Sequence, residues 1–228
     1  MTDSAEKDFD AMREAMLETI AEHASHAGPG IGRSKIGARV LDVMGRLPRQ
    51  EFVPFEIRPF AYLDQPLPVA CGKTISQPFM VALMTDLLDV GEKDIVLEIG
   101  TGFGYQAAVL AALAAKVYTV ELIEELAEEA VKRFARLGIT NIEARVGDGA
   151  RGWAEAGPFD RIMVTAAPDL IPPALFGQLK TGGRMVVPAG IAEAQQLMLV
   201  TKDKDGHLET EQLLPVRFSE LESEDDFD

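Results

Sequence analysis

The stretch that decides the fold is IVLEIGTGFG, residues 95–104. It opens with an apolar run of strand length, and three glycines follow at Gly100, Gly102 and Gly104. Because an alanine-rich helix is predicted over 104–114, the glycines should form a tight turn between a buried strand and a helix, where the backbone can approach a ligand closely. The spacing is G-x-G-x-G and not the G-x-G-x-x-G of dinucleotide enzymes, so the turn alone leaves the ligand open.

From residue 94 onwards the sequence predicts alternating strands and helices. Apolar runs of strand length are separated by segments with helical periodicity. The expected strands are 95–99, 117–120, 141–146, 161–165 and 184–188, and the expected helices are 104–114, 123–137 and 172–179. Runs 197–200 and 211–217 should close the chain as an antiparallel pair. The pattern predicts an α/β, Rossmann-like fold with a mainly parallel, doubly wound sheet and N-terminal helices.

The region before this pattern is predicted to begin with two helices. Apolar residues at helical spacing predict a helix over 6–24, which the run GPGIG at 28–32 should end. Ser34 is expected to cap a second helix that stops at Pro48.

A proline-rich segment, 53–68, is expected to form a loop with short strands. Ser76 and Pro78 then indicate a helix start, with Ser76 as the N-cap and Pro78 in the first turn. We divide the chain into N-terminal helices with a substrate-side segment (1–75), a methyltransferase domain (76–218) and an acidic tail (219–228), within one structural domain. The tail is expected to be disordered.

Composition limits the function classes. The chain has 228 residues, 47 % of them hydrophobic, and no apolar run that approaches the roughly 20 residues needed to span a bilayer. Its net charge of −15 repels phosphate backbones, so we expect no nucleic-acid partner and no membrane partner. Cys71 is the single cysteine, which excludes an internal disulfide, and the polar N-terminus lacks a signal-peptide pattern. These features predict a cytoplasmic protein.

Acidic residues after the next two predicted strands reduce the range of ligands that the glycine turn could bind. Glu121 lies about 20 residues beyond the turn, where an acid accepts hydrogen bonds from two ribose hydroxyls. Asp148 follows the third strand and is placed to bind an adenine amino group, or it forms an ordinary Asp-Gly turn. The first cation after the turn is Lys116, so no pyrophosphate site is evident. The negative charge of Glu98 would be compatible with a positively charged sulfonium nearby. Alternatively, Glu98 serves as a structural cap. Together these residues predict S-adenosylmethionine as the cofactor.

Several blocks resemble the protein-L-isoaspartate O-methyltransferase family over about residues 48–200. They are FAYLDQPLP (60–68), TISQP (74–78), VLEIGTGFGYQAA (96–108), GDGARGW (147–153), PFDRI (158–162) and VTAA (164–167). Among methyltransferases the TISQP block is specific to this family. The resemblance implies repair chemistry, in which the enzyme methylates the misplaced α-carboxylate of an L-isoaspartyl residue.

The resemblance also implies the site residues. Ser76 is the expected catalytic residue, and we expect it to cap its helix as well. A carboxylate with a pKa of about 4 is already ionised at neutral pH, so the reaction needs positioning and no general base. The expected cofactor-binding residues are Thr74, Ile75, Ser76, Glu98, Gly100, Thr101, Gly102, Gly104, Glu121, Leu122, Asp148 and Gly149; no metal site is expected.

The chain departs from the family pattern at Cys71, at Phe103, where a small residue is usual, and at 219–221. These departures keep two alternatives open: a diverged carboxyl methyltransferase with another peptide acceptor, and a non-catalytic nucleoside-binding protein of the same fold. The expected partners are isoaspartyl-containing proteins or peptides, and we favour a monomer.

Overall fold

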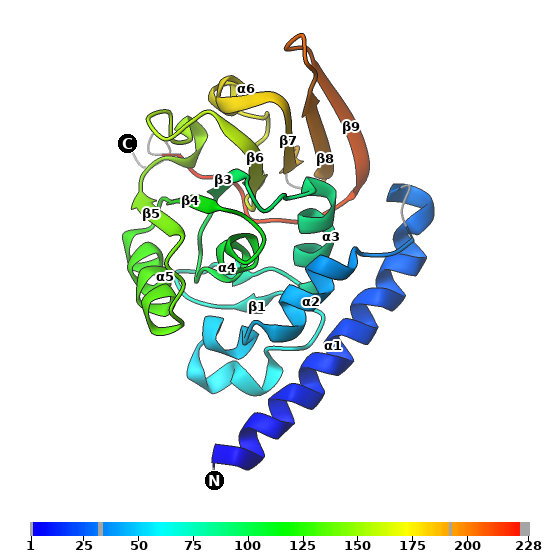
Figure 1. Cartoon of the computed structure of the whole chain (residues 1–228), viewed down its shortest axis with the longest axis vertical. Helices are drawn as coiled ribbons and strands as arrows, with labels where there is room; N and C mark the ends of the chain where they lie inside the picture. The colour runs from blue at the N-terminus through cyan, green and yellow to red at the C-terminus, as the bar shows by residue number, and fades with distance from the viewer. Residues whose placement is uncertain (1, 32–33, 192, 224–228) are drawn as a thin grey trace.

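The computed structural model describes residues 2–31, 34–191 and 193–223, and a seven-stranded sheet forms its centre (Figure 1). The strand order is β5-β4-β3-β6-β7-β8-β9. The strands are β3 (Ile95–Ile99), β4 (Lys116–Glu121), β5 (Ile142–Val146), β6 (Phe159–Val164), β7 (Leu179–Ala189), β8 (Gln196–Lys202) and β9 (Leu208–Pro215). The strands from β5 to β7 are parallel, whereas β8 runs antiparallel to both β7 and β9. The predicted mainly parallel sheet with a closing antiparallel pair is therefore confirmed.

The chain leaves the centre of this sheet in two directions. It runs from β3 to β4 and β5, and then returns to β6 beside β3. In open α/β sheets, such a reversal of strand order places a ligand crevice at the carboxyl ends of the two strands. The fold therefore locates a binding site where β3 and β6 end.

Helices surround the sheet. They are α1 (Thr2–Ile31), α2 (Ala38–Arg46), α3 (Pro78–Leu88), α4 (Tyr105–Ala111), α5 (Glu124–Arg136) and α6 (Pro173–Gln178). Helix α1 packs along α2 and α3 on the outside of the molecule (Figure 1). Among the described residues, no helix combines the length and the apolar character that crossing a membrane requires.

Alternating residues of the strands pack on the two faces of the sheet. Val96 of β3 joins the larger hydrophobic cluster, which includes residues of α1 to α5, whereas its neighbour Leu97 joins the smaller cluster with α6. Both side chains are fully buried. Parallel strands that are covered on both faces carry continuous apolar runs, which is why residues 95–99 could be recognised as a strand.

The predicted end of the first helix was wrong. Helix α1 continues through Gly28 and ends at Ile31, although a proline removes a backbone donor and crowds the preceding turn. Ala24 and Ile31 lie two helical turns apart, and both side chains are buried in the larger cluster. Packing of these residues against α2 and α3 outweighs the local helix-breaking signal.

Both predicted serine caps were also wrong. Gly37, and not Ser34, precedes the first turn of α2, and Asp86 accepts a hydrogen bond from its N–H at 2.9 Å. Gln77, and not Ser76, is the N-cap of α3 and makes no side-chain capping bond. The first turn of α3 is bound instead by Asp64, whose Oδ1 accepts from the N–H of Phe79 at 2.7 Å. An acid distant in sequence performs the task that the local pattern had assigned to serine.

The proline-rich segment contains more regular structure than expected. It contains the 3₁₀ helix η2 (Phe55–Phe60), and a second 3₁₀ helix, η1 (Arg49–Phe52), directly precedes it. The two-residue strand β1 (Leu67–Pro68) ends the segment, which agrees with a predicted short strand there, and it pairs in a hairpin with β2 (Thr74–Ile75), which lies beyond the segment. This hairpin carries the first residues of the TISQP block to the end of the sheet.

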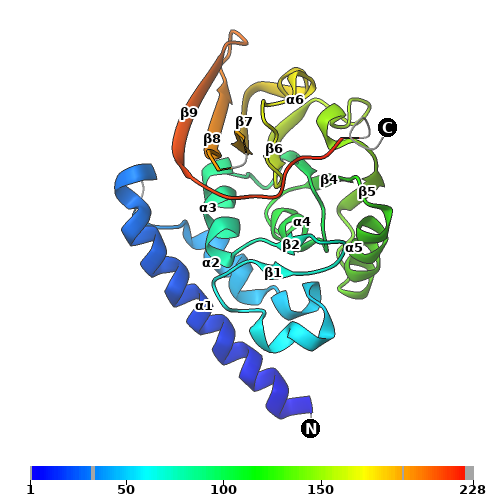
Figure 2. The ribbon, with the colours of Figure 1, turned by 180° about the vertical axis from the view of Figure 1, so that it is seen from behind.

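The C-terminal segment returns across the sheet after β9 (Figure 2). Ala167 donates to the carbonyl of Ser219 at 2.8 Å and accepts from the N–H of Leu221 at 2.9 Å, so the segment pairs with the chain beyond β6. Disorder was expected from residue 219. Residues 219–223 instead follow a defined course, and residues 224–228 lie outside the described part of the chain.

Candidate active site

Glu121 ends β4 and faces the glycine turn on the neighbouring strand. Its Oε2 accepts from the N–H of Gly102 at 2.8 Å, and its Oε1 accepts from the N–H of Ile123 at 3.1 Å. An ionised carboxylate can accept about four hydrogen bonds. The remaining capacity is available to the hydroxyls of a ligand beside the turn.

The glycine turn is supported from behind and open in front. Gly100 has a φ of 92°, and a Cβ at this position would lie 2.5 Å from Oγ1 of Thr165. That hydroxyl lies 2.7 Å from the carbonyl oxygen of Gly100 and 3.0 Å from that of Ile99. A Cβ on Gly102 would meet nothing within 4 Å. The space in front of the turn therefore admits a ligand to the backbone.

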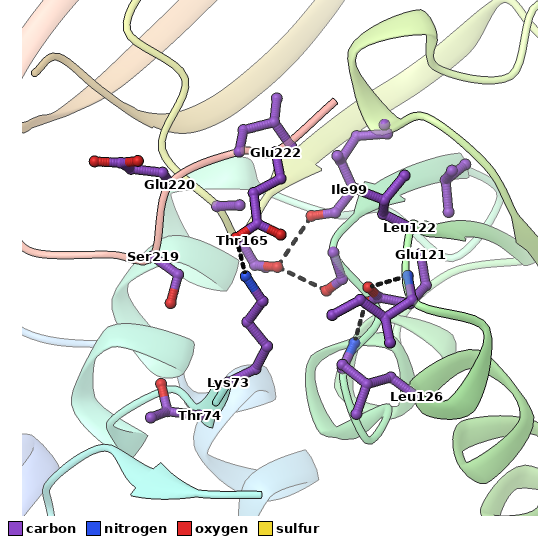
Figure 3. A pocket seen from close by; sticks show the side chains of 17 residues that line it. Lys73, Thr74, Ile99, Glu121, Leu122, Leu126, Thr165, Ser219, Glu220 and Glu222 are labelled. Atoms are coloured by element: carbon purple, nitrogen blue, oxygen red, sulfur yellow. Dashed lines mark hydrogen bonds and ion pairs between the residues drawn. The ribbon is translucent and has the colours of Figure 1, made fainter. Parts of the chain in front are cut away.

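A cleft of about 620 Å³ lies at the carboxyl ends of β3 and β4 (Figure 3). Residues from the strand ends, from the β1–β2 hairpin, from α5 and from the C-terminal segment line it. They are Lys73, Thr74, Ile99, Gly100, Gly102, Val120, Glu121, Leu122, Ile123, Leu126, Gly149, Thr165, Ala166, Ser219, Glu220, Leu221 and Glu222.

This cleft suits an adenosyl cofactor. Glu121 offers free acceptor capacity for ribose, and apolar side chains such as Ile99 and Leu126 border the same space. Lys73 is the single cationic side chain among the described lining residues, and it lies across the cleft from the glycine turn. Among the described lining residues that follow the strands, a pyrophosphate would find no cation, which agrees with a cofactor that carries none.

The side of the cleft opposite Glu121 is built by segments that are far apart in sequence. Lys73 and Thr74 come from the hairpin, and residues 219–222 come from the C-terminal segment. The ammonium of Lys73 lies 2.7 Å from Oε1 of Glu222, which joins the two segments at the cleft (Figure 3).

The structure brings part of the predicted site together. Six of the predicted cofactor-binding residues line the cleft: Thr74, Gly100, Gly102, Glu121, Leu122 and Gly149. Six others are placed around it but are not among the lining residues: Ile75, Ser76, Glu98, Thr101, Gly104 and Asp148.

Glu98 lies beneath the turn, fully buried. Its Oε2 accepts from Oγ1 of Thr119 at 2.6 Å, and Oγ1 of Thr119 lies 2.6 Å from that of Thr101. Burial raises the pKa of Glu98 to about 8. The side chain is therefore protonated at neutral pH and supports the turn through a buried polar chain, without presenting a negative charge to the cleft.

Asp148 and Gly104 serve local structure in the described contacts. Oδ1 of Asp148 accepts from the N–H of Ala150 at 2.8 Å and caps the short 3₁₀ helix η3 (Gly149–Arg151). A Cβ on Gly104 would lie 2.5 Å from Cε1 of Phe134 in α5. The absence of a side chain at Gly104 lets α5 pack closely on the start of α4.

Ser76 is half-buried beside the cleft, directly after β2. Arg49 fixes its backbone, since Nη2 of the guanidinium donates to the Ser76 carbonyl at 2.7 Å. The neighbouring Ile75 is buried in the larger hydrophobic cluster. The TISQP turn is therefore anchored at two consecutive residues.

Sequence reasoning missed several residues of the cleft. Thr165 could have been found, because it is the last residue of the predicted strand 161–165, which lies beside β3. Lys73, Ser219, Glu220 and Glu222 gave no local signal, since their place depends on the hairpin and on the return of the C-terminal segment.

Comparisons with known proteins agree with this geometry. The family model for protein-L-isoaspartate(D-aspartate) O-methyltransferase matches residues 32–226. Protein-L-isoaspartate O-methyltransferase 1 of Polaromonas sp. is 52 % identical over 217 residues, which cover 95 % of this chain and 92 % of the relative. Protein-L-isoaspartate O-methyltransferase 2 of Syntrophobacter fumaroxidans is 51 % identical over 219 residues, covering 96 % and 89 %.

Solved structures show the same fold. A protein-L-isoaspartate O-methyltransferase superposes with a TM-score of 0.77 at 30 % identity, covering 91 % of this chain and 65 % of the other. A putative protein-L-isoaspartate O-methyltransferase of Plasmodium falciparum, in complex with S-adenosyl-L-homocysteine, superposes with a TM-score of 0.78 at 22 % identity and covers 92 % and 98 %.

The doubly wound sheet, the open glycine turn and the acid at the end of β4 suit an adenosyl cofactor, and together with the family match they define a methyltransferase that uses S-adenosylmethionine. Within this class the match extends over nearly the whole chain. The chain belongs to the protein-L-isoaspartate(D-aspartate) O-methyltransferase family.

Proposed function

We propose that this chain transfers the methyl group of S-adenosylmethionine to the α-carboxylate of L-isoaspartyl residues in damaged proteins or peptides, which starts their repair to aspartyl. The observation that carries the proposal is that Thr74 of the TISQP block and Glu121 of the cofactor side line one cleft. The family match supports the same reaction. We place this reaction in the cytoplasm and in a monomer.

The chemistry requires positioning. An ionised carboxylate oxygen supplies an electron pair to the methyl carbon, the carbon–sulfur bond breaks, and a methyl ester and a neutral thioether result, with no proton transferred. The cofactor supplies an activated methyl group on a sulfonium. Glu121 and the glycine turn hold the cofactor side of the cleft, and the TISQP turn holds the acceptor side. Alignment of reacting atoms can supply about 7–11 kcal/mol of such a barrier.

We assign acceptor positioning to Ser76. Its turn is fixed by Arg49 and by buried Ile75, so a hydroxyl there could orient the acceptor without ordering a flexible loop. The N-cap role expected for the same side chain is filled otherwise, which leaves the hydroxyl available for the acceptor. Ser76→Ala should lower kcat while affinity for S-adenosyl-L-homocysteine is unchanged, and Ser76→Thr should keep part of the activity. A normal rate for Ser76→Ala would exclude this role.

The reaction is tested with labelled S-adenosylmethionine and a pair of peptides that differ only in an isoaspartyl or an aspartyl linkage. Base-labile label on the isoaspartyl peptide alone is the expected result. Label on the aspartyl peptide alone would indicate a diverged acceptor. Cofactor binding without label on either peptide would favour a non-catalytic protein.

A further inference from the structure

The chain places one of its own carboxylates on the single cation of the cleft. Nζ of Lys73 lies 2.7 Å from Oε1 of Glu222, and the two side chains are 25 % and 37 % exposed. Among the described lining residues, Lys73 is the only cation, whereas Glu121, Glu220 and Glu222 are acids. In a chain with a net charge of −15, this ammonium is the one positive side chain that an anionic acceptor meets among the described residues of the cleft lining.

The two partners of this ion pair are held differently. Lys73 belongs to the turn of the β1–β2 hairpin: its N–H donates to the carbonyl of Ala70 and its carbonyl accepts from the N–H of Val69, both at 2.9 Å. Glu222 follows a segment in which Ser219 and Leu221 each share one backbone hydrogen bond with Ala167. The cation therefore sits on a paired hairpin, and the carboxylate sits on a C-terminal segment held beside the chain beyond β6.

The ion pair is weak enough to be exchanged. A partly exposed ion pair contributes little net stability, because solvent screens both charges and ordering two long side chains costs entropy. A substrate carboxylate that enters the cleft can therefore displace Glu222 from Lys73 at small cost, because the lysine exchanges one carboxylate for another.

We propose that Lys73 binds the α-carboxylate of the isoaspartyl acceptor, and that Glu222 competes with the acceptor for this cation. The inference rests on the proposed function, which supplies an acceptor that is itself a carboxylate. Lys73 binds one carboxylate oxygen and leaves the other to attack the methyl carbon. Glu222 makes acceptor binding weaker than Lys73 alone would allow, so it tunes the enzyme's affinity for damaged sites.

A purely structural ion pair would behave differently. If the pair only fastened the C-terminal segment over the cofactor, removal of either charge would loosen the segment. Both substitutions would then weaken cofactor binding and act on peptide binding in the same direction. Competition predicts opposite directions for the two substitutions.

The test measures KM for an isoaspartyl peptide and the affinity for S-adenosyl-L-homocysteine in Lys73→Gln, Lys73→Arg and Glu222→Gln. Lys73→Gln should raise the peptide KM about tenfold, and Lys73→Arg should restore most of it, because a charge-assisted hydrogen bond is worth about 1.5 kcal/mol. Glu222→Gln should lower the peptide KM about threefold. Affinity for S-adenosyl-L-homocysteine should stay within about twofold in all three.

Matched controls lie at the opposite end of the sheet. Lys116 and Glu143 form an ion pair of 3.2 Å with similar exposure, 32 % and 52 %, near the amino ends of β4 and β5. Lys116→Gln and Glu143→Gln should leave both constants unchanged. An increase of the peptide KM in both Lys73→Gln and Glu222→Gln would overturn the proposal, and so would a parallel loss of cofactor affinity. A wild-type protein that does not methylate the isoaspartyl peptide would overturn the proposed function, and this inference with it.

Discussion

The two sides of the cleft are built in different ways. The strand-end side consists of the glycine turn and Glu121, which follow adjacent strands of one sheet. The opposite side consists of the β1–β2 hairpin and residues 219–222, which lie about 150 residues apart in sequence and meet through Lys73 and Glu222. A cofactor can therefore be held by a local β-α-β unit, whereas the acceptor side depends on the complete fold.

This difference implies different sensitivities to substitution. Changes on the strand-end side should alter cofactor affinity or the pH dependence of stability. Changes on the opposite side should alter the positioning of the TISQP turn and the acceptor.

The largest effect is expected from the buried acid under the glycine turn. Burial raises the pKa of Glu98 to about 8 from an ordinary value of 4.5. Between these values the folded state keeps a proton that the unfolded state releases, so stability falls as pH rises from about 5 to 8 and then levels. The variant Glu98→Gln should not show this pH-dependent fall in stability, because glutamine does not titrate. Relative to the variant, the wild type should lose on the order of 3 kcal/mol of unfolding free energy over that interval.

Urea denaturation at pH 5, 6.5 and 8 measures this difference. Glu143→Gln provides a control, because it removes an exposed carboxylate from the same sheet. Parallel pH profiles of the wild type and Glu98→Gln would mean that Glu98 is ionised in the folded protein.

On the opposite side, Arg49→Met should destabilise the protein by about 3 kcal/mol. Arg49 is fully buried, and its Nε and Nη2 donate to the carbonyls of Ala61 and Ser76, each at 2.7 Å. Its guanidinium also stacks 4.7 Å from the ring centre of Tyr105. The substitution removes the guanidinium donors of a buried carbonyl at Ala61 and a half-buried carbonyl at Ser76. Because one of them belongs to Ser76, methyl transfer should fall more than cofactor binding.

Denaturation measures the loss of stability in Arg49→Met. Calorimetry with S-adenosyl-L-homocysteine measures cofactor binding, which is then compared with the rate of methyl transfer. Arg49→Lys keeps the charge but not the planar fork of donors, so it should recover only part of the stability. Arg46→Met, at an exposed position of α2, should change stability by less than about 0.5 kcal/mol. Equal losses of cofactor affinity and of kcat in Arg49→Met would show that Arg49 supports the whole cleft and not the acceptor side.

Glu121→Ala tests the cofactor side directly. It removes the acceptor for two backbone N–H groups and for the ribose, so affinity for S-adenosyl-L-homocysteine should fall about 30-fold, or about 2 kcal/mol. Calorimetric titration measures the change, and Glu143→Ala is the matched surface control. An unchanged affinity in Glu121→Ala would contradict the assigned role.

The sequence was sufficient for the strand-end side because its signals are local. Residues 95–99 form one continuous apolar run, and Glu121 lies at a fixed distance beyond the glycines. The boundaries of β3 were predicted to the residue, and its parallel neighbours followed from the repeated β-α-β pattern.

The opposite side could not be predicted from local patterns, because distant residues replaced the expected partners. Asp64 took the place of Ser76 at the start of α3, and core packing of Ile31 outweighed the helix-breaking run before it. Lys73 and Glu222 came together only through the return of the C-terminal segment. Helical spacing and capping rules relate residues that are at most about four or five positions apart in sequence. The residues in each of these contacts are separated by more positions than that.

The smallest effect is expected at the residue that links the two sides. Phe103, which stands where the family usually has a small residue, is buried, and its ring lies 3.9 Å from the guanidinium carbon of Arg133 in α5. Nε of Arg133 donates to the carbonyl of Glu51 in η1 at 3.1 Å. The glycine turn is thereby connected to the 3₁₀ helix that also contains Arg49.

Phe103→Leu keeps apolar bulk but removes the cation–π contact, so it should destabilise the protein by about 1 kcal/mol. Cofactor affinity should be unchanged, because Phe103 is not among the residues that line the cleft. A double-mutant cycle with Arg133→Met, followed by urea denaturation, should give a coupling energy of about the same size. Additive losses would mean that the Phe103–Arg133 contact does not couple the glycine turn to η1, and the stacking of Arg49 on Tyr105 would remain as a link between η1 and the start of α4.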